Sequence, residues 1–201
     1  MLNLIITGAT AYISTSIDYL IILMLLFGRA KNRRDRWAIY WGDLLGTSIL
    51  VGTALIMAFV LHFVPATWLL GFLGLIPIYL GIHLLIEPDD DDQDAIQQKI
   101  KHQRSLILNV ILITASSCGA DNIGIYVPLF VPLSTGEIGV ILLTFLVMLS
   151  LFCLIGYELV RLPQIAVVLG KYGRWISAIV YLLLGLYVMW ESGTFSHLFG
   201  W

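Results

Sequence analysis

Long apolar stretches separated by short polar connections dominate the chain. A helix needs about 20 mostly apolar residues to cross a bilayer, and six stretches of the sequence approach or exceed that length. This pattern predicts an all-α membrane protein with six transmembrane helices. The predicted spans are Leu4–Phe27, Trp37–Phe63, Trp68–Ile86, Leu106–Val127, Ile138–Tyr157 and Trp175–Trp190.

The positive charges fall into alternate connections between these spans. Residues 28–36 carry five Lys and Arg, the connection after the third span carries three, and the connection after the fifth span carries the last three of eleven. These connections share one side of the membrane, and basic connections face the cytoplasm. Both termini are therefore expected outside the cytoplasm. The amino terminus is expected to be a retained span, since it lacks the basic start and the cleavage site of a signal peptide.

The two halves of the sequence resemble each other. Ser14 to Asp18 in the first span matches Ser117 to Asp121 in the fourth, with an offset of 103 residues between the two aspartates. Gly81 and Gly185, with their neighbours, match at an offset of 104 residues. Because each repeat contains three spans, the sequence predicts two inverted three-helix repeats. We expect one transmembrane domain over residues 1–201, with repeats at about 1–87 and 105–201 and a cytoplasmic loop at about 88–104.

Composition agrees with a membrane protein and excludes several functional classes. Of the 201 residues, 59% are hydrophobic and 12% are charged, whereas soluble domains contain about 25% charged residues. The sequence has no phosphate-binding loop of the Walker type and no soluble segment long enough for a nucleotide-hydrolysing domain. No enzymatic activity, no cofactor and no nucleic-acid partner are expected. The acidic run at residues 89–92 lacks the spacing of a calcium loop and is interpreted as a solvated loop.

A polar interruption at residues 116–122 divides the fourth apolar stretch. A charged side chain at bilayer depth costs about 2.5–3.5 kcal/mol on insertion scales, so such groups usually face a bundle interior or an aqueous cavity. A functional site is therefore the first hypothesis for this segment. The competing interpretation is that Ser, Cys and Asn pack helices together and that Asp121 has a structural partner.

The chemistry of this segment and of its repeat mate suits a divalent cation. On unbroken helices Asp18 and Asp121 would differ in depth by roughly 10 Å, so a shared ion requires that the helices tilt or unwind. The residues before each aspartate could accommodate a break. Pro77, between two glycines, marks a third expected irregularity. Carboxylate and amide oxygens with a thiolate favour a cation of intermediate or soft character. The predicted metal ligands are Ser14, Thr15, Asp18, Ser117, Cys118, Asp121 and Asn122.

Asp43 and Cys118 each have more than one interpretation, whereas Cys153 has one. Asp43 lies one to two turns into the second span, where snorkelling to the membrane surface or a role as inner gate competes with membership of the metal site. It is also a candidate proton carrier. Cys118 is either the soft ligand or a small buried hydrophobe. Cys153 is expected to have no role in transport.

The sequence resembles the cadmium resistance transporter family, which belongs to the lysine-exporter superfamily. The resemblance covers nearly the whole chain and is carried by Asp18 in its hydroxyl-rich setting and by the segments 73–81 and 115–122, with Cys118–Asn122 as its most specific part. It implies a bacterial plasma-membrane protein that exports cadmium, with zinc as a second substrate. One departure is Gly42-Asp43, where the resemblance suggests Gly-Gln.

The sequence thus predicts a secondary transporter that exports these cations in exchange for protons by alternating access. The expected partners are the metal as substrate, protons as counter-ion and the lipid bilayer. The sequence leaves open whether the protein forms a homodimer. Three alternatives remain at this point: a manganese or amino-acid exporter on the same scaffold, a structural membrane protein, and an intramembrane serine protease built on Ser117 and His83.

Overall fold

A computed structural model describes residues 1–17, 19–61, 71–86, 105–161 and 163–194. Helices account for most of these residues and no strand occurs among them, which confirms the all-α prediction. The predicted loop with its acidic run lies outside the described residues, as does Asp18. The elements are α1 (Leu2–Ser16), α2 (Tyr19–Arg29), α3 (Arg33–Leu61), the 3-10 helix η1 (Gly71–Gly74), α5 (Leu75–Ile86), α7 (Leu106–Ser117), α8 (Gly119–Phe130), α9 (Thr135–Leu159) and α10 (Pro163–Glu191).

The length and composition of these helices support two to four membrane spans. Helices α3 and α9 are each long and apolar enough to cross a bilayer, and the pairs α1–α2 and α7–α8 each qualify as one bent span. The remaining apolar segments, Gly71–Ile86 and Trp175–Trp190, are each shorter than 18 residues. The protein is therefore a helical membrane protein, while six spans remain a prediction.

The start of α10 and the segment around Pro77 are given in more detail by the structure than by hydropathy. Helix α10 begins at Pro163, twelve residues before the predicted sixth span, so Lys171 and Arg174 lie in a helix and not in a connection. Hydropathy ends a span at the first charges, whereas backbone hydrogen bonding continues past them, and proline is well suited to a first helical position. Before Pro77 the chain changes from the 3-10 helix η1 to α5, which is the irregularity expected there.

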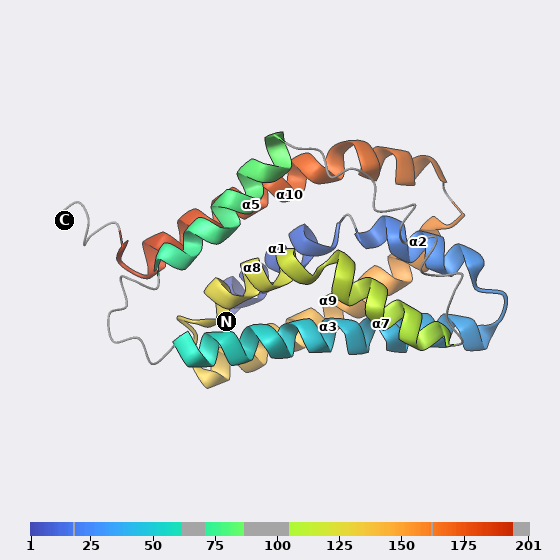
Figure 1. Ribbon diagram of the computed structural model, residues 1–201, viewed down its shortest axis with the longest axis horizontal. Coiled ribbons are helices and arrows are strands. Elements are labelled where there is room, and N and C mark those ends of the chain that lie inside the picture. Colours follow the sequence, from blue (N-terminus) through green and yellow to red (C-terminus); the bar gives the residue numbers. More distant parts are fainter. Residues whose placement is uncertain (18, 62–70, 87–104, 162, 195–201) are drawn as a thin grey trace.

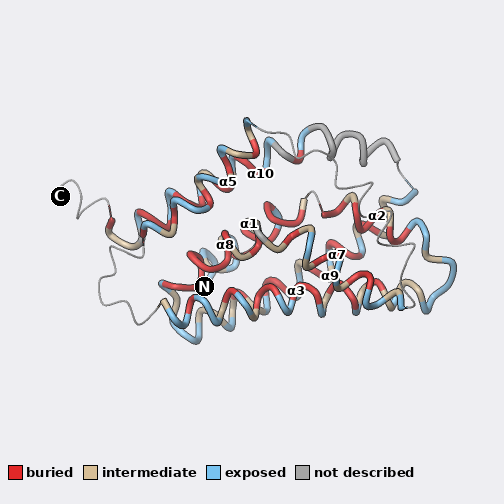
Figure 2. Tube along the Cα trace, viewed as in Figure 1, coloured by how far each residue is buried: buried red, intermediate tan, exposed pale blue. Residues whose placement is uncertain are grey.

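The helices form three layers, which can be followed in Figure 1. Helices α5 and α10 lie side by side in one layer and α1 and α8 lie in the middle, while α3 packs against both α7 and α8, and α9 packs against both α1 and α2. Figure 2 shows that buried residues dominate α8 and the second half of α1, whereas α3 and α9 each keep an exposed face. That face is apolar, as a lipid-facing surface requires; its residues include Ile49, Ile56, Phe59, Leu143, Val147 and Leu154.

Aromatic rings fill the core between α1, α8 and α9. The ring of Phe145 lies 4.6 Å from that of Tyr126 and 5.6 Å from that of Tyr12, measured between centroids. Tyr12 also meets Phe152 edge to face at 5.5 Å. Such pairs contribute about 0.5–1.5 kcal/mol each beyond the burial of their area. They fix the middle layer against α9.

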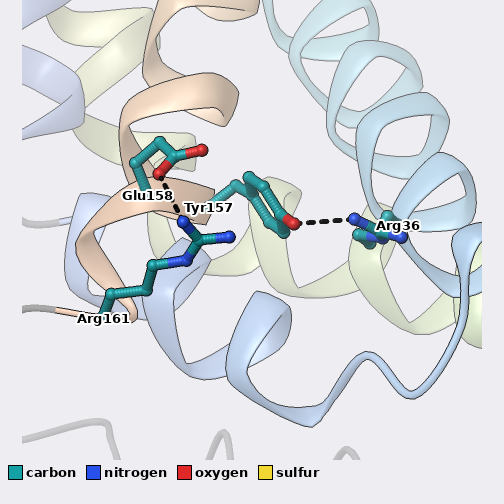
Figure 3. A network of polar contacts seen from close by, with 4 residues as sticks. All are labelled: Arg36, Tyr157, Glu158 and Arg161. Carbon is teal, nitrogen blue, oxygen red and sulfur yellow. Dashed lines mark hydrogen bonds and ion pairs between the residues drawn. The ribbon is translucent and has the colours of Figure 1, made fainter.

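One end of the molecule gathers arginines around Tyr157 (Figure 3). Arg36, at the start of α3, donates a hydrogen bond of 2.7 Å to the Tyr157 hydroxyl, and its guanidinium lies 5.2 Å from the centre of the tyrosine ring. Arg161, just after α9, lies 5.9 Å from the same ring centre and pairs with Glu158 at 3.5 Å. Two of the three basic connections therefore meet at one end, which is the arrangement that the charge pattern predicts.

Glycines bring the backbones of α5 and α10 into direct contact. A Cβ atom added to Gly74 would lie 2.5 Å from the carbonyl oxygen of Gly185, and one added to Gly185 would overlap the carbonyl oxygen of Gly74. A Cβ atom at Gly81 would lie 2.9 Å from the carbonyl oxygen of Ala178. Small residues permit this close approach between membrane helices.

We expect Gly185→Ala to destabilise the protein, because its methyl group would meet backbone atoms that cannot move aside without separating α5 from α10. Overpacking of this kind typically costs about 1–3 kcal/mol. The matched control is Gly52→Ala in α3, where no atom lies within 4 Å of the added carbon. Thermal unfolding in detergent should show a lower melting temperature for the first variant alone; equal melting temperatures would contradict the proposed close contact.

Candidate functional site

Both polar spans are broken helices. The axes of α1 and α2 differ by 66°, and those of the two halves of the 106–130 span by 71°. Cys118 forms the second break: its N–H still bonds to the carbonyl of Thr114 at 3.1 Å, and its own carbonyl accepts the first bond of α8, from Asn122 N–H at 2.9 Å. The breaks lie at the polar segments whose residues could accommodate them.

Two hydroxyl hydrogen bonds join the broken spans crosswise. Thr15, at the end of α1, is 2.9 Å from the hydroxyl of Tyr126 in α8. Tyr19, at the start of α2, is 2.7 Å from the hydroxyl of Thr114 in α7. All four side chains are buried. Each half of one span is therefore bonded to a half of the other, on both sides of the breaks.

The direction of the first crosswise bond follows from the other bonds of Thr15. Its hydroxyl is 3.2 Å from the carbonyl oxygens of Ala11 and Tyr12 in its own helix and can only donate to them. The proton shared with Tyr126 must then come from the tyrosine. The Thr15 oxygen keeps one lone pair for a further partner.

The predicted ligands lie on both sides of the breaks. Ser14 is buried, donates to the carbonyl of Ala11 at 2.9 Å, and accepts at its own carbonyl a bond of 2.8 Å from Ser177 of α10. Cys118 is buried, whereas Ser117 and Asp121 are half-buried. Asp18, the remaining carboxylate of the predicted site, lies outside the described residues, so its distance from Asp121 remains a prediction.

Asn122 carries a side-chain oxygen that is buried without a hydrogen-bond partner. The residue is 3% exposed and sits in the first turn of α8. Among the described residues, its Oδ1 is the one buried side-chain nitrogen or oxygen left in this state. Leaving such an acceptor unpaired costs about 1–3 kcal/mol. An amide oxygen kept in this state next to a carboxylate is suited to bind a cation.

Asp43 is fully buried, which makes the snorkelling interpretation wrong. Its carboxylate is 1% exposed and lies 3.3 Å from the Thr114 hydroxyl and 3.4 Å from the Cys153 thiol, both of which donate to it. Gly42 and Gly46 place it there, since added Cβ atoms would lie 2.6 Å and 2.7 Å from side-chain carbons of α7. The two glycines let α7 approach α3 closely enough for Thr114 to reach the carboxylate.

A metal site in this region has to combine few anionic ligands with neutral oxygens. Within the described ranges no three His, Cys, Asp or Glu side chains converge as a metal cluster. Cys118 and Asp121 are one turn apart around the break, with Asn122 beside them. The hydroxyls and carbonyls of the breaks would have to complete such a site, together with Asp18.

Sequence reasoning missed several residues of this polar core. Tyr19 directly follows Asp18, and Tyr126 follows Asn122 by one helical turn on the same face, so both positions carried a usable signal. Thr114 and Cys153 carried none, because their importance comes from the helices packed against them. Cys153, expected to be inert, contacts Asp43.

The sequence model of the cadmium resistance transporter family matches residues 12–201, nearly the whole chain. The chain belongs to this family. The resemblance recognised in segments 73–81 and 115–122 is thereby confirmed. A search of curated proteins and a search of solved structures each found no match.

Family membership makes the chain a membrane transporter connected with cadmium resistance and heavy-metal efflux. It favours a transporter over the intramembrane protease that the sequence alone left open. The helical structure with its apolar outer faces agrees with this assignment.

We expect Asn122→Leu, a change of nearly equal volume, to stabilise the metal-free protein, because it removes the unpaired buried oxygen. The gain in the free energy of unfolding should approach the roughly 1–3 kcal/mol that such an unpaired oxygen costs. The same variant should lose much of the rise in melting temperature that cadmium produces. Asn109→Leu, at another buried asparagine of the neighbouring half-helix α7, should keep that rise. Loss of stability together with an unchanged cadmium effect would contradict a role of Asn122 in cation binding.

Proposed function

We propose that this protein exports divalent heavy-metal cations from the cytoplasm, cadmium first and zinc second, in exchange for protons. The observation that carries the proposal is the pair of broken spans, bent by 66° and 71°, whose halves are bonded crosswise at Thr15–Tyr126 and Tyr19–Thr114. Broken helices of this kind form the midplane ion sites of secondary transporters.

Six spans in two inverted repeats are the architecture that we propose for this function. Both halves of the chain present the same order: a bent span, a long apolar helix and a shorter apolar segment. The bent span of each half packs against the long helix of the other, α3 against α7 and α8, and α9 against α1 and α2. Exchange of the two halves therefore leaves this pattern of contacts unchanged.

The glycine contacts between α5 and α10 support the same symmetry. The offset of 104 residues relates Gly81 to Gly185 and also relates Gly74 to Ala178. Gly74 contacts Gly185 and Gly81 contacts Ala178, so exchange of the halves converts one contact into the other. An exact interchange of this kind is expected of inverted repeats related by a two-fold axis.

The transported ion is proposed to bind at the two breaks. Asp18 and Asp121 supply carboxylates, and Cys118 supplies a thiolate that favours cadmium and zinc over magnesium and calcium. Asn122, Ser14, Thr15 and Ser117 contribute neutral oxygens, among which the unpaired Oδ1 of Asn122 is already available. Protons would occupy the carboxylates when the metal has left.

Proton exchange is proposed because export works against the membrane potential. Moving two positive charges outward across 100 mV costs about 4.6 kcal/mol, from about 2.3 kcal/mol per charge. No nucleotide-hydrolysing motif is present in the sequence to supply this energy. The arginine-rich end in Figure 3 is placed at the cytoplasm by the positive-inside rule, which puts both termini outside.

We expect Asp18→Asn and Asp121→Asn each to abolish cadmium resistance while leaving the amount of protein in the membrane unchanged, because each removes a charge that the cation requires. Asp35→Asn, at a half-buried carboxylate near the start of α3 that accepts a bond of 3.0 Å from the Lys31 N–H, is the matched control and should retain resistance. Growth in cadmium, with immunoblots of membranes, provides the measurement. Normal resistance in either variant would remove that aspartate from the site.

Purified protein in liposomes that contain a pH-sensitive dye tests the coupling. An outward gradient of protons should drive cadmium uptake into the vesicles, and cadmium movement should in turn carry protons the other way. The Asp121→Asn protein serves as the control for leak. Cadmium flux without opposite proton movement at every imposed pH difference would exclude antiport and leave a uniporter.

A further inference from the structure

Asp43 lies at the centre of a second polar cluster, which adjoins the two breaks. Its Oδ2 accepts from the Cys153 thiol at 3.4 Å and its Oδ1 from the Thr114 hydroxyl at 3.3 Å. Tyr19 extends the cluster through its 2.7 Å bond to Thr114. These four side chains come from four different helices, α3, α9, α7 and α2, and each is at most 5% exposed.

The described residues supply no positive charge to this carboxylate. None of their Lys, Arg or His side chains forms an ion pair with Asp43, and the side chains that hydrogen-bond to it are neutral. A buried ionised carboxylate without a counter-charge is strongly disfavoured. The carboxylate therefore needs either a proton or a bound cation to neutralise its charge.

The distance between the thiol and the carboxylate fits a shared metal ion. Zinc binds cysteine sulfur at about 2.3 Å and carboxylate oxygen at about 2.1 Å, which at a tetrahedral angle places the two ligand atoms about 3.6 Å apart. The observed separation of Cys153 Sγ and Asp43 Oδ2 is 3.4 Å. A cation between them would take the place of the thiol proton, which would leave to water, and the Thr114 hydroxyl would be a third ligand.

The charge of the cluster also favours a divalent ion. One thiolate and one carboxylate carry two negative charges, so a bound divalent cation leaves the buried site neutral. A thiolate ligand selects cadmium and zinc over magnesium and calcium. We propose that Asp43 and Cys153, with the Thr114 hydroxyl, form a second site for a soft divalent cation.

The proposed site lies between the arginine-rich end and the two breaks, where a cation that moves toward the breaks would bind first. Arg36 and Asp43 are two turns apart on α3, about 10 Å along its axis, so the cluster lies inward from the arginine-rich end in Figure 3. Thr114 is one turn before Cys118, whose N–H bonds to its carbonyl at 3.1 Å. The proposal rests on metal export for the identity of the ion, while its test measures binding and not export.

The two cysteines of the chain allow this site to be observed separately. In a Cys118→Ser background Cys153 is the last thiol, so the ultraviolet charge-transfer absorption of a cadmium thiolate reports this site alone. We expect cadmium to produce this absorption in purified Cys118→Ser protein and not in the Cys118→Ser/Cys153→Ser protein. Adding Asp43→Asn to the Cys118→Ser background should weaken cadmium binding at least about tenfold, since loss of even an outer-shell partner costs that much. Adding Asp35→Asn instead should leave it unchanged.

Absence of the absorption in Cys118→Ser protein, with the absorption present in the wild type, would overturn the second site and leave the proposed function intact. Absence of both the absorption and cadmium-dependent stabilisation in the wild type would overturn both proposals. Should the Cys118→Ser protein fail to fold, the wild type and Cys153→Ser are compared by cadmium bound per chain. We expect a decrease from two ions to one; an unchanged count would overturn the second site.

Discussion

The crosswise hydrogen bonds between the broken spans are the constraint on which the rest of the structure depends. A break in a membrane helix frees backbone N–H and C=O groups, each of which costs several kcal/mol when it meets hydrocarbon instead of a partner. Here the breaks face each other within the bundle, and Thr15–Tyr126 and Tyr19–Thr114 tie the four half-helices together around them. The aromatic core around Phe145 and the glycine contacts at Gly42 and Gly46 hold the long helices against these halves. A tilt of one broken span must therefore displace the other, which is the mechanical coupling that an alternating-access transporter needs.

Several helix contacts follow the same pattern in both halves of the chain, but the polar side chains do not. The contacts of α3 and α9 with the opposite broken spans, and those between α5 and α10, interchange when the halves are exchanged. Asp43 has no such counterpart, because the residue 103 positions later is Leu146. A fully symmetric carrier would offer the same ligands to an ion approaching from either side. The proposed site at Asp43 and Cys153 would add a carboxylate and a thiol on the side of the arginine-rich end, where they would favour the capture of soft cations from that side.

The sequence indicated where the helices break but not which side chains meet across the breaks. Ser14 to Asp18 and Ser117 to Asn122 are polar where hydrocarbon is expected, and that contrast alone indicated both interruptions. Helix periodicity describes one helix at a time, so it carried no information about Tyr126 meeting Thr15 or Cys153 meeting Asp43, which are 111 and 110 residues apart in the chain. The start of α10 was misplaced for a related reason: hydropathy detects lipid contact, whereas the helix is defined by its backbone. Asp43 was recognised as important, but its burial depends on α7 packing against Gly42 and Gly46.

Burial also restricts how the proposed sites exchange their ions. In a region of low dielectric constant, a change in the net charge of a site costs much more than a change of ligand. When a divalent cation leaves a thiolate and a carboxylate, as at Cys153 and Asp43, the site stays neutral only when two protons replace it. At the proposed site of Asp18, Asp121 and the Cys118 thiolate, two protons in place of the cation likewise leave the net charge of the site unchanged. We therefore expect two protons to enter for each divalent cation that leaves. Such an exchange moves no net charge across the membrane, so the outward step no longer works against the membrane potential, and the pH difference alone would drive export.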